Sequence, residues 1–181
     1  MKDKDLHKIL DYIKHEKTLD RGFRLIVANY KERLYWLIRR ILISHDDTND
    51  ALQDTFVKIW QNIQNYRGDA ELYTWLYRIA VNEALGFLKK KKRQHLGLSN
   101  YGEVLSQQLE SDVYFEGNEF QKTLQKAILT LPEQQRLVFN MKYFEEIKYK
   151  DMAVILDKSE GALKANYHHA VKKIEEFVKT N

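Results

Sequence analysis

The stretch "KYKDMAVILDKSEGALKANYHHAVKKIEEF", residues 148–177, contains two helical apolar patterns separated by a short polar junction. In the junction "LDKS", Asp157 can adopt a positive φ, and Ser159 is placed to cap the helix that follows. A short helix, a tight turn and a longer helix with a polar outer face are the sequence form of a helix-turn-helix. The stretch therefore predicts a helical unit at the C-terminal end of the chain.

The second helix of this stretch has one face spaced to meet a core and one polar face. The inward set is Leu163, Tyr167, Ala170, Val171 and Ile174. The outward set comprises Glu160, Lys164, Ala165, His168 and His169. Short or flat side chains can approach a major groove closely, and Lys or His can donate hydrogen bonds to bases or phosphates. This face favours DNA binding, and the alternative is an ordinary solvated helix surface.

The rest of the chain is also patterned as helices. Residues 23–42, 47–66 and 74–93 show helical spacing, and so do the later stretches "FQKTLQKAILTL" and "PEQQRLVFNMKYFE". The 181 residues include only 7 glycines and 1 proline, so few positions disfavour helix. We therefore predict an all-α fold.

A change of composition divides the chain into two helical domains. Residues 94–121 contain five acidic residues, no Lys or Arg, and scattered Gly, Ser and Asn. This composition predicts a flexible acidic linker. The predicted domains are residues 1–93 and residues 122–181, and the second contains the helix-turn-helix.

Several classes of function are disfavoured because the sequence lacks the motifs that they require. The chain has no cysteine, its six histidines are dispersed, and we find no phosphate loop, nucleophile elbow or metal-ligand spacing. The sequence thus predicts no enzyme, cofactor or metal site. Its charged N-terminus and the lack of a long apolar run predict a cytoplasmic protein without membrane insertion.

One helical face in the first domain is unusual because it contains no basic residue. Within "DTNDALQDTFVKIWQNIQNY", this outer face consists of Asp50, Gln53, Asp54, Val57 and Gln61. The face is either a partner-binding surface or simply a solvated acidic surface.

A second surface of the first domain combines cations with aromatic rings. Its members are Tyr66, Arg67, Tyr73, Trp75, Arg78, Asn82, Lys89 and Lys90, the last two within the basic run of residues 89–93. Cations suit phosphates and flat rings suit unstacked bases, so this set favours single-stranded DNA. The alternative is that the aromatic residues are core and that the lysines only favour the helix C-terminus.

Together these stretches resemble the bacterial RNA polymerase sigma factors of the extracytoplasmic-function (ECF) group of the sigma-70 family. "DALQDTFVKIW" is similar to region 2.2 and "YRGDAELYTWLYRIAVNEALGFLKKKKR" to regions 2.3 and 2.4. "LPEQQRLVFNMKYFEEIKYKDMAVILDKSEGALKANYHHAVKKI" is similar to region 4. The resemblance implies a non-catalytic factor that directs core RNA polymerase to promoter DNA and assists promoter opening.

The resemblance also implies a role for each surface. The polymerase-docking positions would be Asp50, Gln53, Asp54 and Val57. The minus-10 positions would be Tyr66, Arg67, Tyr73, Trp75, Arg78, Asn82, Lys89 and Lys90. The minus-35 positions would be Ser159, Lys164, Ala165, His168, His169 and Lys172. The resemblance further implies an anti-sigma factor as a partner. The rival interpretation is a stand-alone helix-turn-helix regulator that acts without polymerase.

Overall fold

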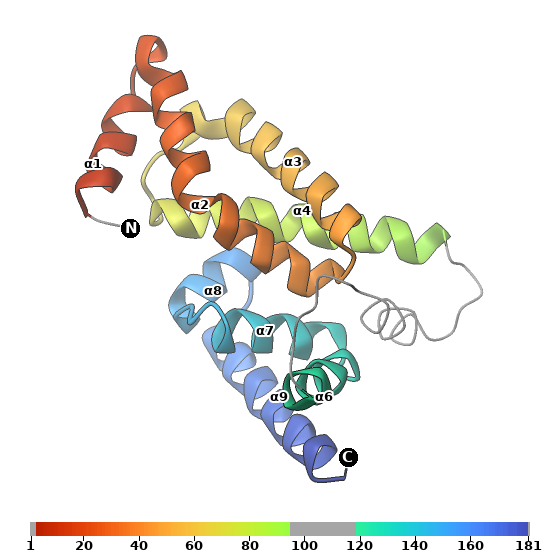
Figure 1. Cartoon of the computed structure of the whole chain (residues 1–181). Coiled ribbons are helices and arrows are strands. Elements are labelled where there is room, and N and C mark those ends of the chain that lie inside the picture. The colour runs from red at the N-terminus through yellow and green to blue at the C-terminus, as the bar shows by residue number, and fades with distance from the viewer. Residues whose placement is uncertain (1–2, 95–118, 181) are drawn as a thin grey trace.

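The computed structural model describes residues 3–94 and 119–180, and within these ranges it contains helices and no strand (Figure 1). The all-α prediction is confirmed. The linker predicted at residues 94–121 falls mostly outside the described residues. Residues 119–121, which that prediction included, belong instead to a helix.

Within residues 3–94, the N-terminal domain consists of four α-helices. They are α1 (Asp3–Tyr12), α2 (Leu19–Leu42), α3 (His45–Asn62) and α4 (Leu72–Gln94), with single 3-10 turns at Glu16–Thr18 and Ile63–Asn65. Helices α2, α3 and α4 pack against one another in pairs, and α1 packs along α2. Their buried faces are aliphatic, and Leu34, Ile59 and Leu76 are fully buried. Burial of these stripes stabilises the domain.

Helix α1 is held against α2 by a close approach at Gly22. A Cβ atom at Gly22 would lie 2.8 Å from Cγ2 of Ile13 and 3.1 Å from Cβ of Tyr12, at the end of α1, so a larger residue would force these groups to shift. Ile9 of α1 is also fully buried in the core. The N-terminal segment is thus an integral part of the first domain.

The described part of the C-terminal domain, residues 119–180, also consists of four helices. They are α6 (Glu119–Leu129), α7 (Glu133–Tyr143), α8 (Tyr149–Leu156) and α9 (Glu160–Thr180). At the junction between α8 and α9, Asp157 adopts the left-handed conformation with φ 52° and ψ 51°. The Ser159 hydroxyl accepts a hydrogen bond from the backbone N–H of Ala162 at 3.2 Å. Both features that the sequence predicted for the turn are confirmed.

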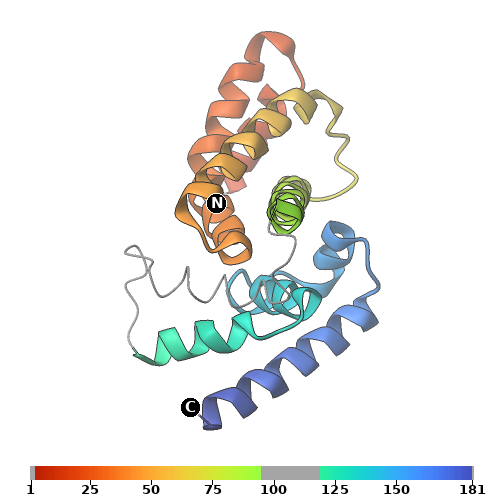
Figure 2. The same ribbon diagram turned by 90° about the vertical axis from the view of Figure 1, so that its right-hand side faces the viewer.

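The two domains pack directly against each other in this structure. Helix α8 lies along α4, and α7 contacts α2, as the two views in Figures 1 and 2 show. Leu137, Met141, Met152 and Ile155 of the second domain join the buried apolar cluster of the first. One apolar cluster therefore crosses the domain boundary.

None of the described helices is both long and apolar enough to span a bilayer.

Candidate nucleic-acid interface

A groove of about 410 Å³ lies between the end of α3 and the middle of α4. It is lined by Lys58, Asn62, Asn65, Trp75, Arg78, Ile79, Asn82 and Glu83. Three residues predicted from the sequence, Trp75, Arg78 and Asn82, therefore meet in one place. The other polar residues that line the groove, Lys58, Asn62, Asn65 and Glu83, were not predicted from the sequence. The groove offers an aromatic ring, three amide side chains and two cations, which are the groups that bind unstacked bases and phosphates.

Helical geometry explains how these residues meet. Arg78 and Asn82 are one turn apart on α4, and Lys58 and Asn62 are one turn apart on α3. The Lys58 ammonium forms an ion pair with Glu83 at 2.5 Å, which joins the two walls. The spacing of Lys58 and Asn62 was visible in the sequence, but their position opposite α4 depends on how the helices pack.

The ring of Tyr66 packs against the ring of Trp75. The two rings are 5.6 Å apart between centroids, and the Tyr66 hydroxyl donates a hydrogen bond to the carbonyl of Ala70 at 2.7 Å. Burial raises the pKa of Tyr66, which keeps this donor protonated. Gly68, with φ 80°, allows the loop to turn back at this point. Tyr66 thus positions Trp75, while neighbouring Arg67 is exposed on the loop.

Tyr73, which was predicted on the same surface, does not line the groove. Its hydroxyl donates a hydrogen bond to the carboxylate of Asp151 on α8 of the other domain. Burial, together with this hydrogen bond, raises the pKa of Tyr73 to about 12, so the hydroxyl remains protonated at neutral pH. In this arrangement Tyr73 contacts the second domain.

The basic residues at the end of α4 (residues 89–93) point in different directions around the helix, so some are exposed and others form ion pairs within the protein. Lys89 and Lys90 are exposed. Lys91 forms an ion pair with Asp47 at 2.9 Å, and Lys92 forms one with Glu133 of α7. Five consecutive cations therefore do not form a single exposed patch.

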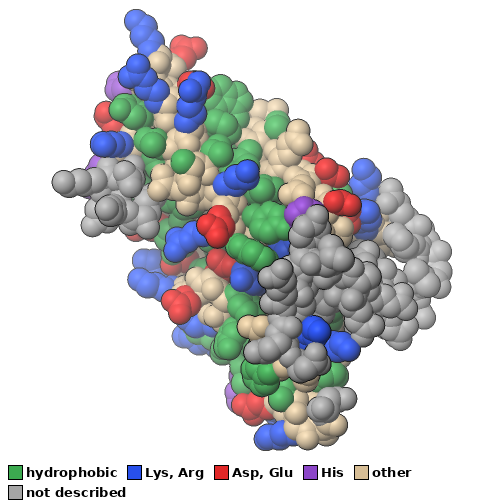
Figure 3. All heavy atoms as spheres, viewed as in Figure 1, with side chains coloured by type: hydrophobic (Ala, Val, Ile, Leu, Met, Phe, Trp, Pro, Cys, Tyr) green, Lys and Arg blue, Asp and Glu red, His purple; other side chains and the backbone are tan. Residues whose placement is uncertain are grey.

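The acidic face of α3 is exposed as the sequence predicted. Asp50, Gln53, Asp54 and Val57 all lie at the surface, and Figure 3 shows acidic side chains gathered over the first half of this helix. Trp60, which was not predicted as part of this face, is 42% exposed and packs edge-on against Phe23 with ring centroids 5.0 Å apart. An exposed tryptophan beside a polar face is typical of protein-protein contact sites.

In the C-terminal domain, the predicted outward side chains of α9 are exposed. They are Lys164, Ala165, His168, His169 and Lys172. The Lys164 ammonium lies 3.7 Å from the Glu160 carboxylate and 5.6 Å from the Tyr149 ring centroid. Ser159 differs from this set because its hydroxyl caps the helix. The first turns of α9 thus present a small, weakly basic surface.

Among the residues that the structure describes, no group of three or more His, Cys, Asp or Glu side chains could hold a metal ion.

Comparison with known families matches both domains. The model of Sigma-70 region 2 matches residues 26–94, and that of Sigma-70 region 4 matches residues 121–174. The ECF RNA polymerase sigma factor SigW of Bacillus subtilis is 30% identical, over 86% of this chain and 89% of its own length. The RNA polymerase sigma-H factor of Pseudomonas aeruginosa is 28% identical, over 86% of this chain and 85% of its own length.

Solved structures agree on the fold. The sigma factor RpoE of Bartonella quintana, solved with the anti-sigma factor NepR, has a TM-score of 0.70 at 20% identity and covers 89% of this chain and 99% of its own. CnrH, solved with the cytosolic domain of CnrY, has a TM-score of 0.70 at 18% identity and covers 98% of each chain. With both regions matched in order, the chain belongs to the extracytoplasmic-function group of the sigma-70 family of RNA polymerase sigma factors.

Proposed function

We propose that this sigma factor directs core RNA polymerase to specific promoters and assists promoter opening. In this proposal, residues 1–93 bind both polymerase and the minus-10 element. Residues 122–181 bind the minus-35 element as a duplex. The observation that supports minus-10 capture most directly is the groove between α3 and α4, because it combines Trp75 with three amides and the exposed Arg78, while the second cation, Lys58, is paired with Glu83.

The groove has the chemistry needed to hold an unpaired base. A base can stack on the flat face of Trp75, while the amides of Asn62, Asn65 and Asn82 can donate to or accept from the base edges. Arg78 is exposed at the rim, where it can contact a phosphate. A base held in this way is no longer available for pairing, which favours the open promoter.

The test of this function is transcription from purified components. Core RNA polymerase alone should not transcribe from a cognate promoter found by library selection, and addition of the chain should produce transcripts with a defined start. A stand-alone regulator would bind a DNA site but would leave core polymerase inactive at it. Absence of core binding and of transcription would contradict the proposed function.

The docking role gives a prediction for the acidic face. Asp54→Lys should weaken the affinity for core polymerase. An acidic face requires a basic surface on its partner, and a lysine would be repelled by that surface. The fold should be unaffected, since Asp54 is exposed and exposed substitutions normally change stability by less than about 0.5 kcal/mol. Co-purification and a binding titration measure the effect. Glu32→Lys, an exposed charge reversal on α2, is the control. Equal core affinity for both variants would contradict the docking assignment.

The minus-35 role gives a prediction for α9. His168→Ala and His169→Ala should change which bases are preferred, whereas Lys172→Ala should lower affinity for all sequences about equally. The reason is that side chains in the first turns reach base edges, while a cation farther along the helix meets phosphates. A promoter-library selection with each variant is the measurement. Identical preferences for wild type and both histidine variants would refute the role of the histidines.

We further propose that a dedicated anti-sigma factor holds this chain inactive. Support comes from the similar structure of the sigma factor RpoE, which was solved in complex with the anti-sigma factor NepR. Affinity capture from the native organism, followed by inhibition of transcription with the purified partner, tests this.

A further inference from the structure

Glu83 is the one acidic residue among those that line the groove between α3 and α4, and its carboxylate is only partly satisfied. The Oε1 atom accepts a hydrogen bond from the Lys58 ammonium at 2.5 Å. Among the residues that the structure describes, no donor forms a hydrogen bond with Oε2. A carboxylate has about four acceptor sites, so most of this capacity is open to a ligand in the groove.

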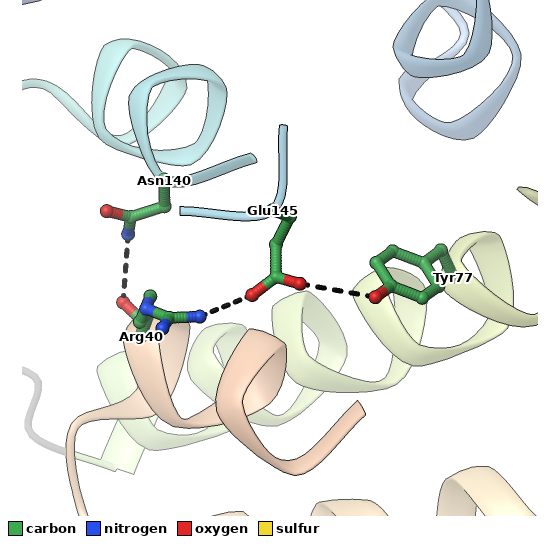
Figure 4. Close-up of polar contacts among 4 residues, drawn as sticks. All are labelled: Arg40, Tyr77, Asn140 and Glu145. Carbon is green, nitrogen blue, oxygen red and sulfur yellow. Dashed lines mark hydrogen bonds and ion pairs between the residues drawn. The ribbon is translucent and has the colours of Figure 1, made fainter. Parts of the chain in front are cut away.

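A carboxylate that only joins helices is bonded differently in this protein. Glu145, in the segment between α7 and α8, uses both of its oxygens (Figure 4). One oxygen forms an ion pair with Arg40 of α2, and the other accepts a hydrogen bond from the Tyr77 hydroxyl of α4 at 3.2 Å. Protein partners thus occupy both oxygens of Glu145, whereas they occupy one oxygen of Glu83. This difference favours a ligand-binding role for Glu83.

The Lys58–Glu83 pair places an anionic acceptor beside a cationic donor. The Glu83 side chain is 17% exposed and that of Lys58 is 52% exposed, and both line the groove. An ammonium has three N–H donors, of which Glu83 takes one. Hydrogen bonds to ionised groups are roughly twice as strong as those between neutral groups, so this pair should bind a base edge more strongly than the nearby amides do.

The pair complements the four bases unequally. Adenine, cytosine and guanine each carry an exocyclic amino group, and each also carries acceptor atoms on its edge. Glu83 can accept a hydrogen bond from the amino group while Lys58 donates one to an acceptor of the same base. Thymine has no amino group, and its one ring N–H lies between two carbonyl oxygens, which a carboxylate repels. The chemistry of the pair therefore disfavours thymine.

The base that meets this pair is a neighbour of the base that stacks on Trp75. Trp75, Ile79 and Glu83 follow one another at steps of four along α4, so they lie on the same side of the helix. The eight residues from Trp75 to Glu83 correspond to about 12 Å along the helix axis. A base stacked on Trp75 thus leaves Glu83 to an adjacent nucleotide of the same strand.

We infer that the Lys58–Glu83 pair is a specificity determinant of the groove, which selects a base with an exocyclic amino group and rejects thymine at one position of the minus-10 element. The inference rests on the proposed function, because that function supplies the promoter strand as the ligand. It adds a chemical preference that the proposed function leaves open. It also gives the ion pair a role beyond joining α3 to α4.

The test exchanges the two charges. Lys58→Glu with Glu83→Lys retains an ion pair between α3 and α4 but places a donor where the acceptor was. Glu83→Gln keeps the shape of the side chain and removes its charge. The control, Asp20→Arg with Arg24→Asp, exchanges the charges of an exposed ion pair on α2 that lies outside the groove. Each protein is combined with core polymerase, and transcribed templates are selected from a promoter library randomised in the minus-10 element.

Wild type and control should show thymine depleted at one position by at least about fivefold, which is the lower end of what a good base contact contributes. Glu83→Gln should lose this depletion, because an amide both donates and accepts. The exchanged pair should go further and enrich thymine at the same position, since a lysine there donates to the thymine carbonyls. Preferences at the other positions should be unchanged. Thermal unfolding curves identify the variants that are folded.

Two results would overturn the inference. One is the same thymine frequency at every position for wild type, Glu83→Gln and the control. The other is an equal loss of transcription from all templates in the two groove variants, with no change of base preference, which is the result expected if the pair only joins the helices. If the exchanged pair does not fold, Glu83→Gln alone decides between these results. Absence of transcription with wild type would contradict the proposed function instead, so the two failures are distinguishable.

Discussion

Trp75→Leu is expected to reduce open-complex formation at a cognate promoter by about 5- to 150-fold, the equivalent of one lost stacked base. Leucine preserves an apolar contact with Tyr66 but removes the flat ring that faces the groove. Trp75→Phe restores a ring at the same position and should recover most of the activity. Permanganate reactivity of the unpaired thymines measures the open complex directly.

The Trp75 prediction requires a check on folding because the side chain is half-buried and its ring packs on Tyr66. Both variants lose part of the indole, so their unfolding temperatures should be similar to each other and slightly below that of wild type. The comparison between Leu and Phe therefore isolates the aromatic face from the loss of packing. Normal promoter opening by a folded Trp75→Leu variant would show that Trp75 does not stack on DNA.

The helical elements were predictable because each has an apolar stripe of helical period and a recognisable end. The junction at Asp157 and Ser159 shows this most clearly, since the predicted left-handed residue and cap both occur. Predicted helix starts were less accurate. The helical pattern that begins at Thr74 predicts the start of α4 there, but the helix begins at Leu72, and Thr74 is buried inside it. A Ser or Thr near a helix start is a weak signal when the preceding residues can also pack.

The candidate site was predictable only in part because it depends on which helices face each other. Trp75, Arg78 and Asn82 were predicted from one helix, where periodicity places them on a common side. Their partners on α3, Lys58 and Asn62, belong to a helix whose rotation relative to α4 is determined by core packing. No local pattern in the sequence encodes that rotation.

Contacts over long sequence separations were not predictable at all. Glu145 and Asp151 looked like ordinary acidic residues at the end of one helix and the start of another. Their partners, Arg40 and Tyr73, lie 105 and 78 residues away along the chain. Charge composition predicts neither pair, because either carboxylate could have been solvated. For the same reason, the division of the basic run into exposed and paired lysines appears only in the structure.

The exposed lysines of this run, Lys89 and Lys90, should have a large effect on the salt dependence of promoter binding. Lys89→Gln with Lys90→Gln removes two exposed cations, and so reduces the number of counterions displaced from the phosphates. The slope of log affinity against log salt should become shallower by about 1.4 to 1.8. Between 50 and 200 mM salt, the variant should thus lose about 7- to 12-fold less affinity than wild type. Titration of promoter-bound holoenzyme at several salt concentrations gives both slopes.

The neighbouring lysine supplies the matched control. Lys91→Gln removes a cation from the next position of the same helix, but this cation is already paired with Asp47 at 2.9 Å inside the first domain. A cation that is neutralised within the protein displaces few counterions from DNA, so its loss should leave the slope close to that of wild type. If the Lys91 variant changes the slope as much per charge as the Lys89 and Lys90 variant, the ion pair does not persist on DNA. In that case the whole run would bind phosphates. If neither variant changes the slope, the end of α4 lies away from the promoter, and the minus-10 surface is confined to the groove around Trp75.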